Sequence, residues 1–305
     1  MHIFSIDLGG TAVKYAVVET INGTYSIKES GSFPTPYQGA DYLISQLADL
    51  VNCHRSSFPL SGIAISTPGS VSGKDGIIFR GGKLRYLDQV PMGYLISNAT
   101  SLPCTVENDG HCGLIGEYIA GALKGCSYGA MIVIGTSIGG GIVLNGKILT
   151  GAHNFAGKFA HLITFPTTDT NNYSYFGVDN GRDGLASLVR RHTNLSEEEP
   201  LTGYQIFDMA ESGNQKVLSA LRKYCHMLAI QLCNIQITID PEIIAIGGGI
   251  SSRTILLNIL KEELFSLCHS FPIKRPVPNI CLALLGNDAN LIGASKVWSE
   301  RNNFS

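Results

Sequence analysis

One short pattern occurs twice along the chain and constrains the fold more than any other feature. It consists of an apolar strand, a glycine-rich turn, a second strand and an Asn-Gly turn. The parts of the first copy are residues 2–7, Gly9-Gly10, 12–18 and Asn22-Gly23. Those of the second copy are 130–134, 135–141, 142–144 and Asn145-Gly146. Because Asn-Gly between apolar runs favours a hairpin, the pattern predicts a duplicated β-rich opening. A chance match between short segments is the alternative.

The segments between and after the two copies alternate between helical and strand patterns, which is typical of α/β architecture. Apolar residues at helical spacing predict helices over 42–53, 112–123, 214–239, 254–269 and 288–298. Further strands are predicted at 24–29, 62–66, 242–246 and 280–285. A chain of 305 residues is about right for two domains, so we expect two hydrophobic cores with a cleft between them.

The composition of the chain indicates which classes of binding partner to expect. The formal net charge is -2 and charged residues make up only 15% of the chain, which argues against nucleic-acid binding. No segment reads as a secretion signal or a membrane span, and the eight cysteines contain no C-x-x-C pair. We therefore expect a cytoplasmic protein with reduced thiols and a small-molecule partner, bound neither to nucleic acid nor to a membrane.

Three glycine-rich segments each follow a predicted strand, at 7–11, 135–141 and 247–251. Glycine-rich turns can point backbone amides at an anion, because glycine tolerates unusual dihedral angles and leaves no side chain in the way. A tight turn without a ligand explains any one of them, but three together favour a nucleotide. Neither G-x-x-x-x-G-K-[ST] nor G-x-G-x-x-G is present, so a different nucleotide fold is needed.

Two acidic positions are candidates for chemistry. Asp7 precedes the first glycine turn and could hold Mg²⁺ through bound waters, with a turn-capping role as the alternative. Asn108-Asp109 offers an amide for sugar hydroxyls and a carboxylate that could act as a base. The same pair before a helix also suits a simple N-cap.

Taken together, these segments resemble the ROK family of sugar kinases, within the superfamily of actin, hexokinase and Hsp70. The resemblance runs from about residue 2 to residue 298. The segments that carry it are DLGGTAVK at 7–14, STPG at 66–69, END at 107–109, GTSIGGG at 135–141, GGGIS at 247–251 and DANLIGA at 288–294. Within the family, the pattern is most similar to bacterial β-glucoside kinases that lack a zinc site.

The resemblance implies an α/β fold of two actin-like (ribonuclease H-like) domains with a cleft between them. The domains would be residues 1–113 plus 288–305 and residues 114–287. The implied reaction is transfer of the γ-phosphoryl group of ATP, with Mg²⁺, to the 6-hydroxyl of a hexose or hexoside. Glucose, a β-glucoside and N-acetylmannosamine are open as acceptor classes. The family is often dimeric, so a homodimer is possible.

The resemblance also assigns residues to roles. Asp109 would be the catalytic base, and Asp7 the carboxylate on the Mg²⁺ side. The residues implied to bind ATP are Asp7, Gly9, Gly10, Thr11, Lys14, Gly135, Thr136, Gly247 and Gly248. Those implied to bind the sugar are Gly69, Asn108, Lys158 and His161. By the same analogy, the basic loop over 79–87 would lie near the sugar, or else be a solvated loop.

The sequence departs from the family at two points. No cysteine cluster follows His161, so we expect no structural zinc site. Lys158 stands where the family has a glutamate that accepts hydrogen bonds from the sugar. The lysine could serve a substrate with an acceptor or negative group, point elsewhere in a reshaped pocket, or mark an inactive sugar-binding sensor. The DNA-binding repressor branch of the family is disfavoured, since the chain starts at the first core strand.

Overall fold

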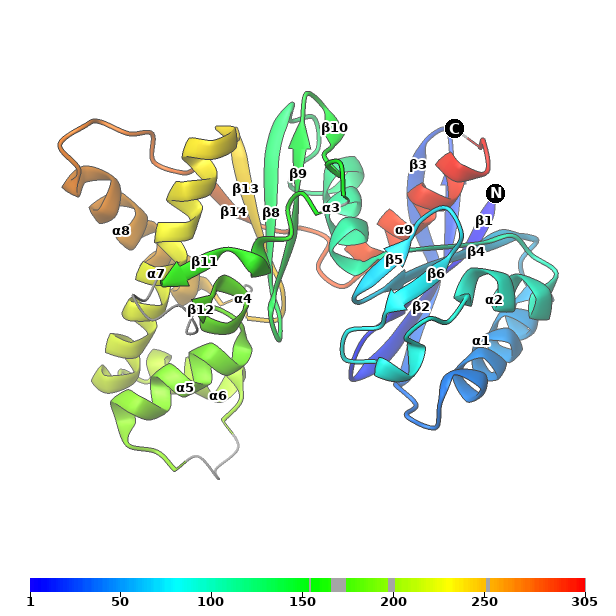
Figure 1. The fold of residues 1–305 in the computed structure, drawn as a ribbon, viewed down its shortest axis with the longest axis horizontal. Helices are drawn as coiled ribbons and strands as arrows, with labels where there is room; N and C mark the ends of the chain where they lie inside the picture. Colours follow the sequence, from blue (N-terminus) through cyan, green and yellow to red (C-terminus); the bar gives the residue numbers. More distant parts are fainter. Residues whose placement is uncertain (154, 166–173, 197–200, 251–252, 305) are drawn as a thin grey trace. The chain divides into compact units, whose positions relative to one another are not determined.

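The computed structural model describes residues 1–153, 155–165, 174–196, 201–250 and 253–304. The chain divides into two compact units, called unit 1 and unit 2 below (Figure 1). Unit 1 comprises Met1–Lys124 and Leu285–Ser305, and unit 2 comprises Gly125–Leu284. Unit 1 runs past the expected boundary at residue 113, because helix α3 (Asp109–Ala120) packs along helix α9 (Asp288–Arg301).

Within the described residues, unit 1 is built on a five-stranded sheet of order β3-β2-β1-β4-β7. Its strands are β1 (His2–Leu8), β2 (Ala12–Ile21), β3 (Thr24–Pro34), β4 (Leu60–Thr67) and β7 (Cys104–Asn108). The first three are antiparallel, whereas β4 and β7 run parallel to β1. The predicted turn between β2 and β3 is confirmed, with positive φ at Asn22 (50°) and Gly23 (75°).

Side chains of β1 alternate between two hydrophobic clusters, as a buried strand requires. Phe4, Ile6 and Leu8 pack in the cluster that includes α1 (Ala40–Arg55) and α2 (Met92–Thr100). Ile3 belongs instead to a cluster with Cys112 of α3 and with α9. A small hairpin of β5 (Ser70–Ser72) and β6 (Ile77–Arg80) follows β4, and the short helix η1 (Arg85–Leu87) comes after it.

Unit 2 repeats the sheet of unit 1, with the order β10-β9-β8-β13-β14. Its strands are β8 (Tyr128–Ile134), β9 (Ile138–Leu144), β10 (Lys147–Ile148), β13 (Ile243–Gly247) and β14 (Ile280–Leu282). Three antiparallel strands again precede parallel ones, and Asn145 and Gly146 again have positive φ (53° and 69°). The predicted duplication is therefore confirmed as a repeated sheet topology.

The remaining elements of unit 2 are mostly helical and bury the core of this sheet. They are η2 (Phe159–His161), β11 (Ile163–Phe165), β12 (Ser174–Tyr175), α4 (Phe176–Asp179), α5 (Arg182–Thr193), α6 (Gly203–Glu211), α7 (Gln215–Ile239) and α8 (Thr254–Ser270). Helix α7 begins as predicted, since the Asn214 side chain accepts hydrogen bonds from two backbone amides of its first turn. No helix in the described part of the chain is long and apolar enough to cross a membrane.

Candidate active site

Asp7 lies at the end of β1 and is held by two donors within unit 1. Its Oδ1 accepts hydrogen bonds from the Ser66 hydroxyl of β4 (2.7 Å) and from the side-chain amide of Asn290 of α9 (2.9 Å). The carboxylate is only 8% exposed. Its other oxygen has no hydrogen-bond partner among the residues described, so it remains available to a ligand.

The glycine turn after Asp7 has its carbonyl groups occupied and some of its amides open. Gly9 O accepts a hydrogen bond from the Thr35 hydroxyl (2.6 Å), Gly10 O from the Tyr37 hydroxyl and Thr11 O from the Thr35 amide (3.0 Å). Within the described segments, no acceptor contacts the amides of Gly10 and Thr11. Since open amides in a glycine turn bind anions, the predicted anion-binding turn has a suitable geometry.

Two further features support the geometry of this turn. A side chain at Gly9 is excluded, because its Cβ atom would lie 2.6 Å from the carbonyl oxygen of Ala12. Lys14, on the following strand, donates a hydrogen bond from Nζ to the side-chain oxygen of Asn287 (2.7 Å), just before α9. In unit 1, the chain's last helix and its first two strands therefore meet at the turn.

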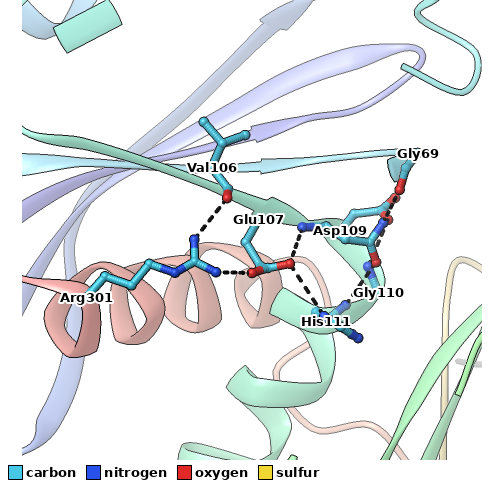
Figure 2. Close-up of polar contacts among 8 residues, drawn as sticks. Gly69, Val106, Glu107, Asp109, Gly110, His111 and Arg301 are labelled. Carbon is cyan, nitrogen blue, oxygen red and sulfur yellow. Dashed lines mark hydrogen bonds and ion pairs between the residues drawn. The ribbon is translucent and has the colours of Figure 1, made fainter. Parts of the chain in front are cut away.

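Asp109 is the first residue of α3 (Figure 2), and Asn108 before it makes two kinds of hydrogen bond. The Asn108 side-chain oxygen accepts a hydrogen bond from the His111 amide (3.3 Å), which makes it the N-cap. Its side-chain amide donates to Gly69 O (2.8 Å) and to Asp109 Oδ1 (3.0 Å). The Gly110 amide donates to the same carboxylate oxygen (2.8 Å). The helix therefore starts at Asp109 rather than at the predicted residue 112, because Asn108 caps it.

The surroundings of Asp109 favour a protonated carboxyl group more than water does. Burial is the larger cause, the negative charge of Asp7 adds to it, and together they raise the pKa of Asp109 to about 6. The hydrogen bonds from Gly110 and Asn108 oppose this shift without cancelling it. A carboxylate with a pKa of about 6 is much better suited to accepting a proton near neutral pH than an ordinary aspartate.

Glu107, two residues before Asp109, is the centre of an ion-pair network that the sequence did not reveal (Figure 2). One carboxylate oxygen accepts a hydrogen bond from the Asn108 amide (2.9 Å) and lies 3.4 Å from His111 Nδ1. The other oxygen pairs with the Arg301 guanidinium, which also donates to Val106 O (3.1 Å). Burial opposes ionisation, but the bonds from His111 and Asn108, with the charge of Arg301, lower the pKa of Glu107 to about 2.

Close packing between α3 and α9 brings these groups together. Glycines replace side chains where the two helices touch: a Cβ atom on Gly293 would lie 1.8 Å from Cys112 O, and one on Gly116 would lie 2.2 Å from Ala289 O. Backbones can approach this closely only where the side chain is absent. Asn290 is therefore held at Asp7, and Arg301 is held at Glu107.

Unit 2 brings two of the other predicted segments together. Gly248 has φ 103°, and a Cβ atom there would lie 2.1 Å from Ile134 O, next to Gly135. Gly135 itself accepts a hydrogen bond from the Arg182 amide (2.9 Å), which anchors the turn to the start of α5. The predicted residues Gly135, Thr136, Gly247 and Gly248 thus lie in one region of unit 2. Ser251, the last residue of the third glycine segment, lies outside the described residues.

A large cavity adjoins the second glycine turn and was not foreseen from the sequence. Its volume is about 1330 Å³, and Thr136 and Ser137 lie at one side of it. Residues of α4, α5 and α7 form most of the rest of its wall, among them Asp179, Asp183 and Gln231. No sequence signal links these helices to the turn, because the cavity arises from how they pack.

Lys158 and His161 lie at either end of one turn of chain in unit 2. Lys158 Nζ lies 5.3 Å from the ring centroid of Phe155, and the His161 ring centroid lies 5.0 Å from the same ring. Lys158 has no carboxylate within 4.0 Å in the part of the chain that the structure describes. The two predicted sugar ligands therefore share one exposed aromatic neighbour.

The described residues contain no group of three or more His, Cys, Asp or Glu that could hold a metal ion. Magnesium needs fewer protein ligands, because it usually keeps several waters and binds one or two carboxylates. The free oxygen of Asp7 fits that requirement.

Comparison with known proteins decides the family. The chain matches the ROK family over residues 3–301. It belongs to the ROK family. It is 30% identical to a β-glucoside kinase of Klebsiella pneumoniae, covering 96% of this chain and 95% of that protein. It is 27% identical to a glucokinase of Halalkalibacterium halodurans, covering 98% and 95% of the two chains.

The fold is shared with solved ROK structures. A ROK family protein from Streptococcus pneumoniae TIGR4, solved in complex with sucrose, superposes with a TM-score of 0.86 at 27% identity and covers 99% of each chain. The expected α/β fold of actin-like domains is thereby confirmed. At the level of the family, the ROK relatives support sugar kinase activity.

Proposed function

We propose that this ROK protein is an ATP-dependent kinase that phosphorylates the 6-hydroxyl group of a hexose or hexoside. The observation that carries the proposal is the position of Asp109, a half-buried carboxylate with a pKa of about 6 in the same unit as the turn after Asp7. A β-glucoside is the first acceptor to test, because similarity to a β-glucoside kinase extends over nearly the whole chain.

In the proposed step, Asp109 accepts the proton of the sugar 6-hydroxyl group. The oxygen of that hydroxyl group attacks the γ-phosphorus of ATP at the same time. A new oxygen–phosphorus bond forms, the bond from the γ-phosphorus to the bridging oxygen breaks, and ADP leaves with the electron pair. Phosphoryl transfer depends mainly on positioning and charge stabilisation, with little covalent work for the protein. Asn108 positions the base, since its side-chain amide bonds both Asp109 and Gly69.

The other predicted residues keep their proposed roles. Mg²⁺, held through waters on the free oxygen of Asp7, would neutralise part of the phosphate charge. The residues proposed to bind ATP are Asp7, Gly9, Gly10, Thr11, Lys14, Gly135, Thr136, Gly247 and Gly248. Those proposed to bind the sugar are Gly69, Asn108, Lys158 and His161.

The raised pKa of Asp109 predicts a pH dependence. The base must be ionised to accept a proton, so kcat/KM is expected to be constant above about pH 7 and to fall below the pKa of about 6. Below pH 6 the decline should approach tenfold per pH unit. Initial rates between pH 5 and 8, at a constant ionic strength, measure this. A flat profile down to pH 5 would mean that Asp109 is not the titrating base.

The activity itself is tested by ADP formation from Mg-ATP with a panel of glucose, β-glucosides and N-acetylhexosamines. The sharpest control is 6-deoxyglucose, which has the same ring but no hydroxyl group at the acceptor position. We expect ADP with at least one acceptor and none above background with the 6-deoxy sugar. Lys158 favours one alternative, a sugar-binding sensor, for which the expected result is sugar binding without any sugar-dependent ADP.

A further inference from the structure

The turn that contains Lys83 is fixed by contacts on both sides of the lysine. The Gly81 amide donates a hydrogen bond to Asp88 Oδ1 (2.7 Å), and the Leu84 amide donates to Gly81 O (2.9 Å). Gly81 is buried, and both Leu84 and Leu87 are fully buried in the core of unit 1. Lys83 therefore projects from a rigid turn, although its own side chain is exposed.

The stem of Lys83 lies against the glycine turn that follows Asp7. A Cβ atom placed on Gly10 would be 3.5 Å from Lys83 Cδ and 3.8 Å from Lys83 Cβ, both at van der Waals distance. Within the described residues, no carboxylate lies within 4.0 Å of the lysine ammonium. The ammonium group of Lys83 therefore makes no ion pair with these residues. It lies next to the glycine turn in which the amides of Gly10 and Thr11 have no hydrogen-bond acceptor in the described part of the chain.

The turn that contains Lys83 also contacts Gly69, whose carbonyl group binds the side chain that positions Asp109. A Cβ atom on Gly82 would lie 3.6 Å from the Gly69 amide nitrogen. Gly69 in turn accepts the hydrogen bond from Asn108, which bonds Asp109. In unit 1, Lys83, the glycine turn and the base are therefore linked by short contacts.

A bound anion at this place needs positive charge to offset Asp7 and Asp109. Lys14, the cation described above on β2 opposite Asp7, already donates its Nζ hydrogen bond to Asn287. During phosphoryl transfer, negative charge is spread over three oxygens of the γ-phosphoryl group, and cations aimed at them stabilise the transition state. Lysine acts on phosphate as a compact point charge, and its flexible stem lets the ammonium follow the moving group.

We propose that Lys83 contacts the γ-phosphoryl group of ATP and stabilises its charge during transfer. This rests on the proposed kinase activity. Sequence analogy alone placed the loop of Lys83 near the sugar, but the contact with Gly10 points to the phosphate instead.

Nucleotide binding tests this contact without relying on turnover. Titration calorimetry would compare wild type with Lys83→Ala and Lys83→Arg, using Mg-AMPPNP and Mg-ADP as the two ligands. Because AMPPNP has the γ-phosphate and ADP lacks it, Lys83→Ala should weaken AMPPNP binding about tenfold or more but leave ADP binding within about threefold. Lys83→Arg should restore much of the AMPPNP affinity. The kcat of Lys83→Ala should fall about 10- to 100-fold, with the KM for the sugar nearly unchanged.

Lys74→Ala is the matched control, since Lys74 is an exposed lysine of the same unit on the β5–β6 hairpin. It should bind and turn over like wild type. Equal affinity of wild type and Lys83→Ala for AMPPNP would overturn the inference and make Lys83 a solvated surface residue. If Lys83→Ala weakened the binding of AMPPNP and ADP equally, the inference would also be overturned, because that result would indicate a disrupted turn rather than a lost contact with the γ-phosphate. If wild type binds AMPPNP but phosphorylates no sugar, the proposed function fails, while the binding comparison still decides the contact of Lys83.

Discussion

Replacing Asp109 by asparagine is expected to lower kcat by about 100- to 10,000-fold, the contribution typical of a positioned general base. Asparagine has nearly the same size and can still accept the hydrogen bonds that Gly110 and Asn108 donate to Asp109 Oδ1. It cannot take up the hydroxyl proton. The loss should therefore be in kcat, with sugar and nucleotide binding changed little.

Single-turnover and steady-state rates, with circular dichroism to verify folding, measure this effect. Asp49→Asn is the matched control, because Asp49 is an exposed carboxylate in α1 that makes none of the contacts described for the site. It should retain wild-type kcat. An Asp109→Asn variant that keeps turnover within about tenfold would be inconsistent with the general-base role.

Replacing Trp298 by alanine is expected to lower the free energy of unfolding by about 3–5 kcal/mol, the usual cost of removing a large buried aromatic side chain. Trp298 is fully buried and packs with Ile3 and Ala64. Its Nε1 donates a hydrogen bond to Pro103 O (2.9 Å). A Cβ atom on Gly62 would lie 2.2 Å from the indole ring. The indole therefore packs directly against the backbone of Gly62, where any side chain would clash with it.

Urea unfolding followed by circular dichroism measures this loss, because Trp298 is the only tryptophan and its fluorescence disappears in the variant. Phe304→Ala is the control. Phe304 stacks on Trp298 with ring centroids 5.5 Å apart but is 54% exposed, so its loss should cost about 1 kcal/mol or less. A Trp298→Ala variant destabilised no more than Phe304→Ala would show that the packing of α9 does not depend on the indole.

Local chemistry made much of the fold predictable. Asn22-Gly23 and Asn145-Gly146 adopt the positive φ angles that such turns require, which fixes two hairpins at corresponding places in the two sheets. Helix α7 starts after Asn214 and ends at Ile239, with Asp240 as its C-cap before Pro241, because capping and proline act within a few residues. The glycine turns were predictable for the same reason.

Other features depend on residues that are distant in sequence. The donors to Asp7 include Asn290, and the partner of Glu107 is Arg301 at the far end of the chain. Only the packing of α9 on α3 brings them together. The pKa of Asp109 likewise depends on burial and on Asp7, neither of which a short pattern reveals. The predicted strand over 280–285 ends at Leu282 in β14, because strand pairing with β13 stops there.

The most direct test of the kinase proposal is to identify the product. Phosphorus NMR of a reaction containing the purified protein, Mg-ATP and the best acceptor should show a sugar phosphate ester coupled to the two protons on carbon 6, formed in step with ADP. The Asp109→Asn variant should form at least about 100-fold less of it. A spectrum that contains only ATP, or only ADP with inorganic phosphate, while the sugar is bound and unchanged, would contradict the proposal.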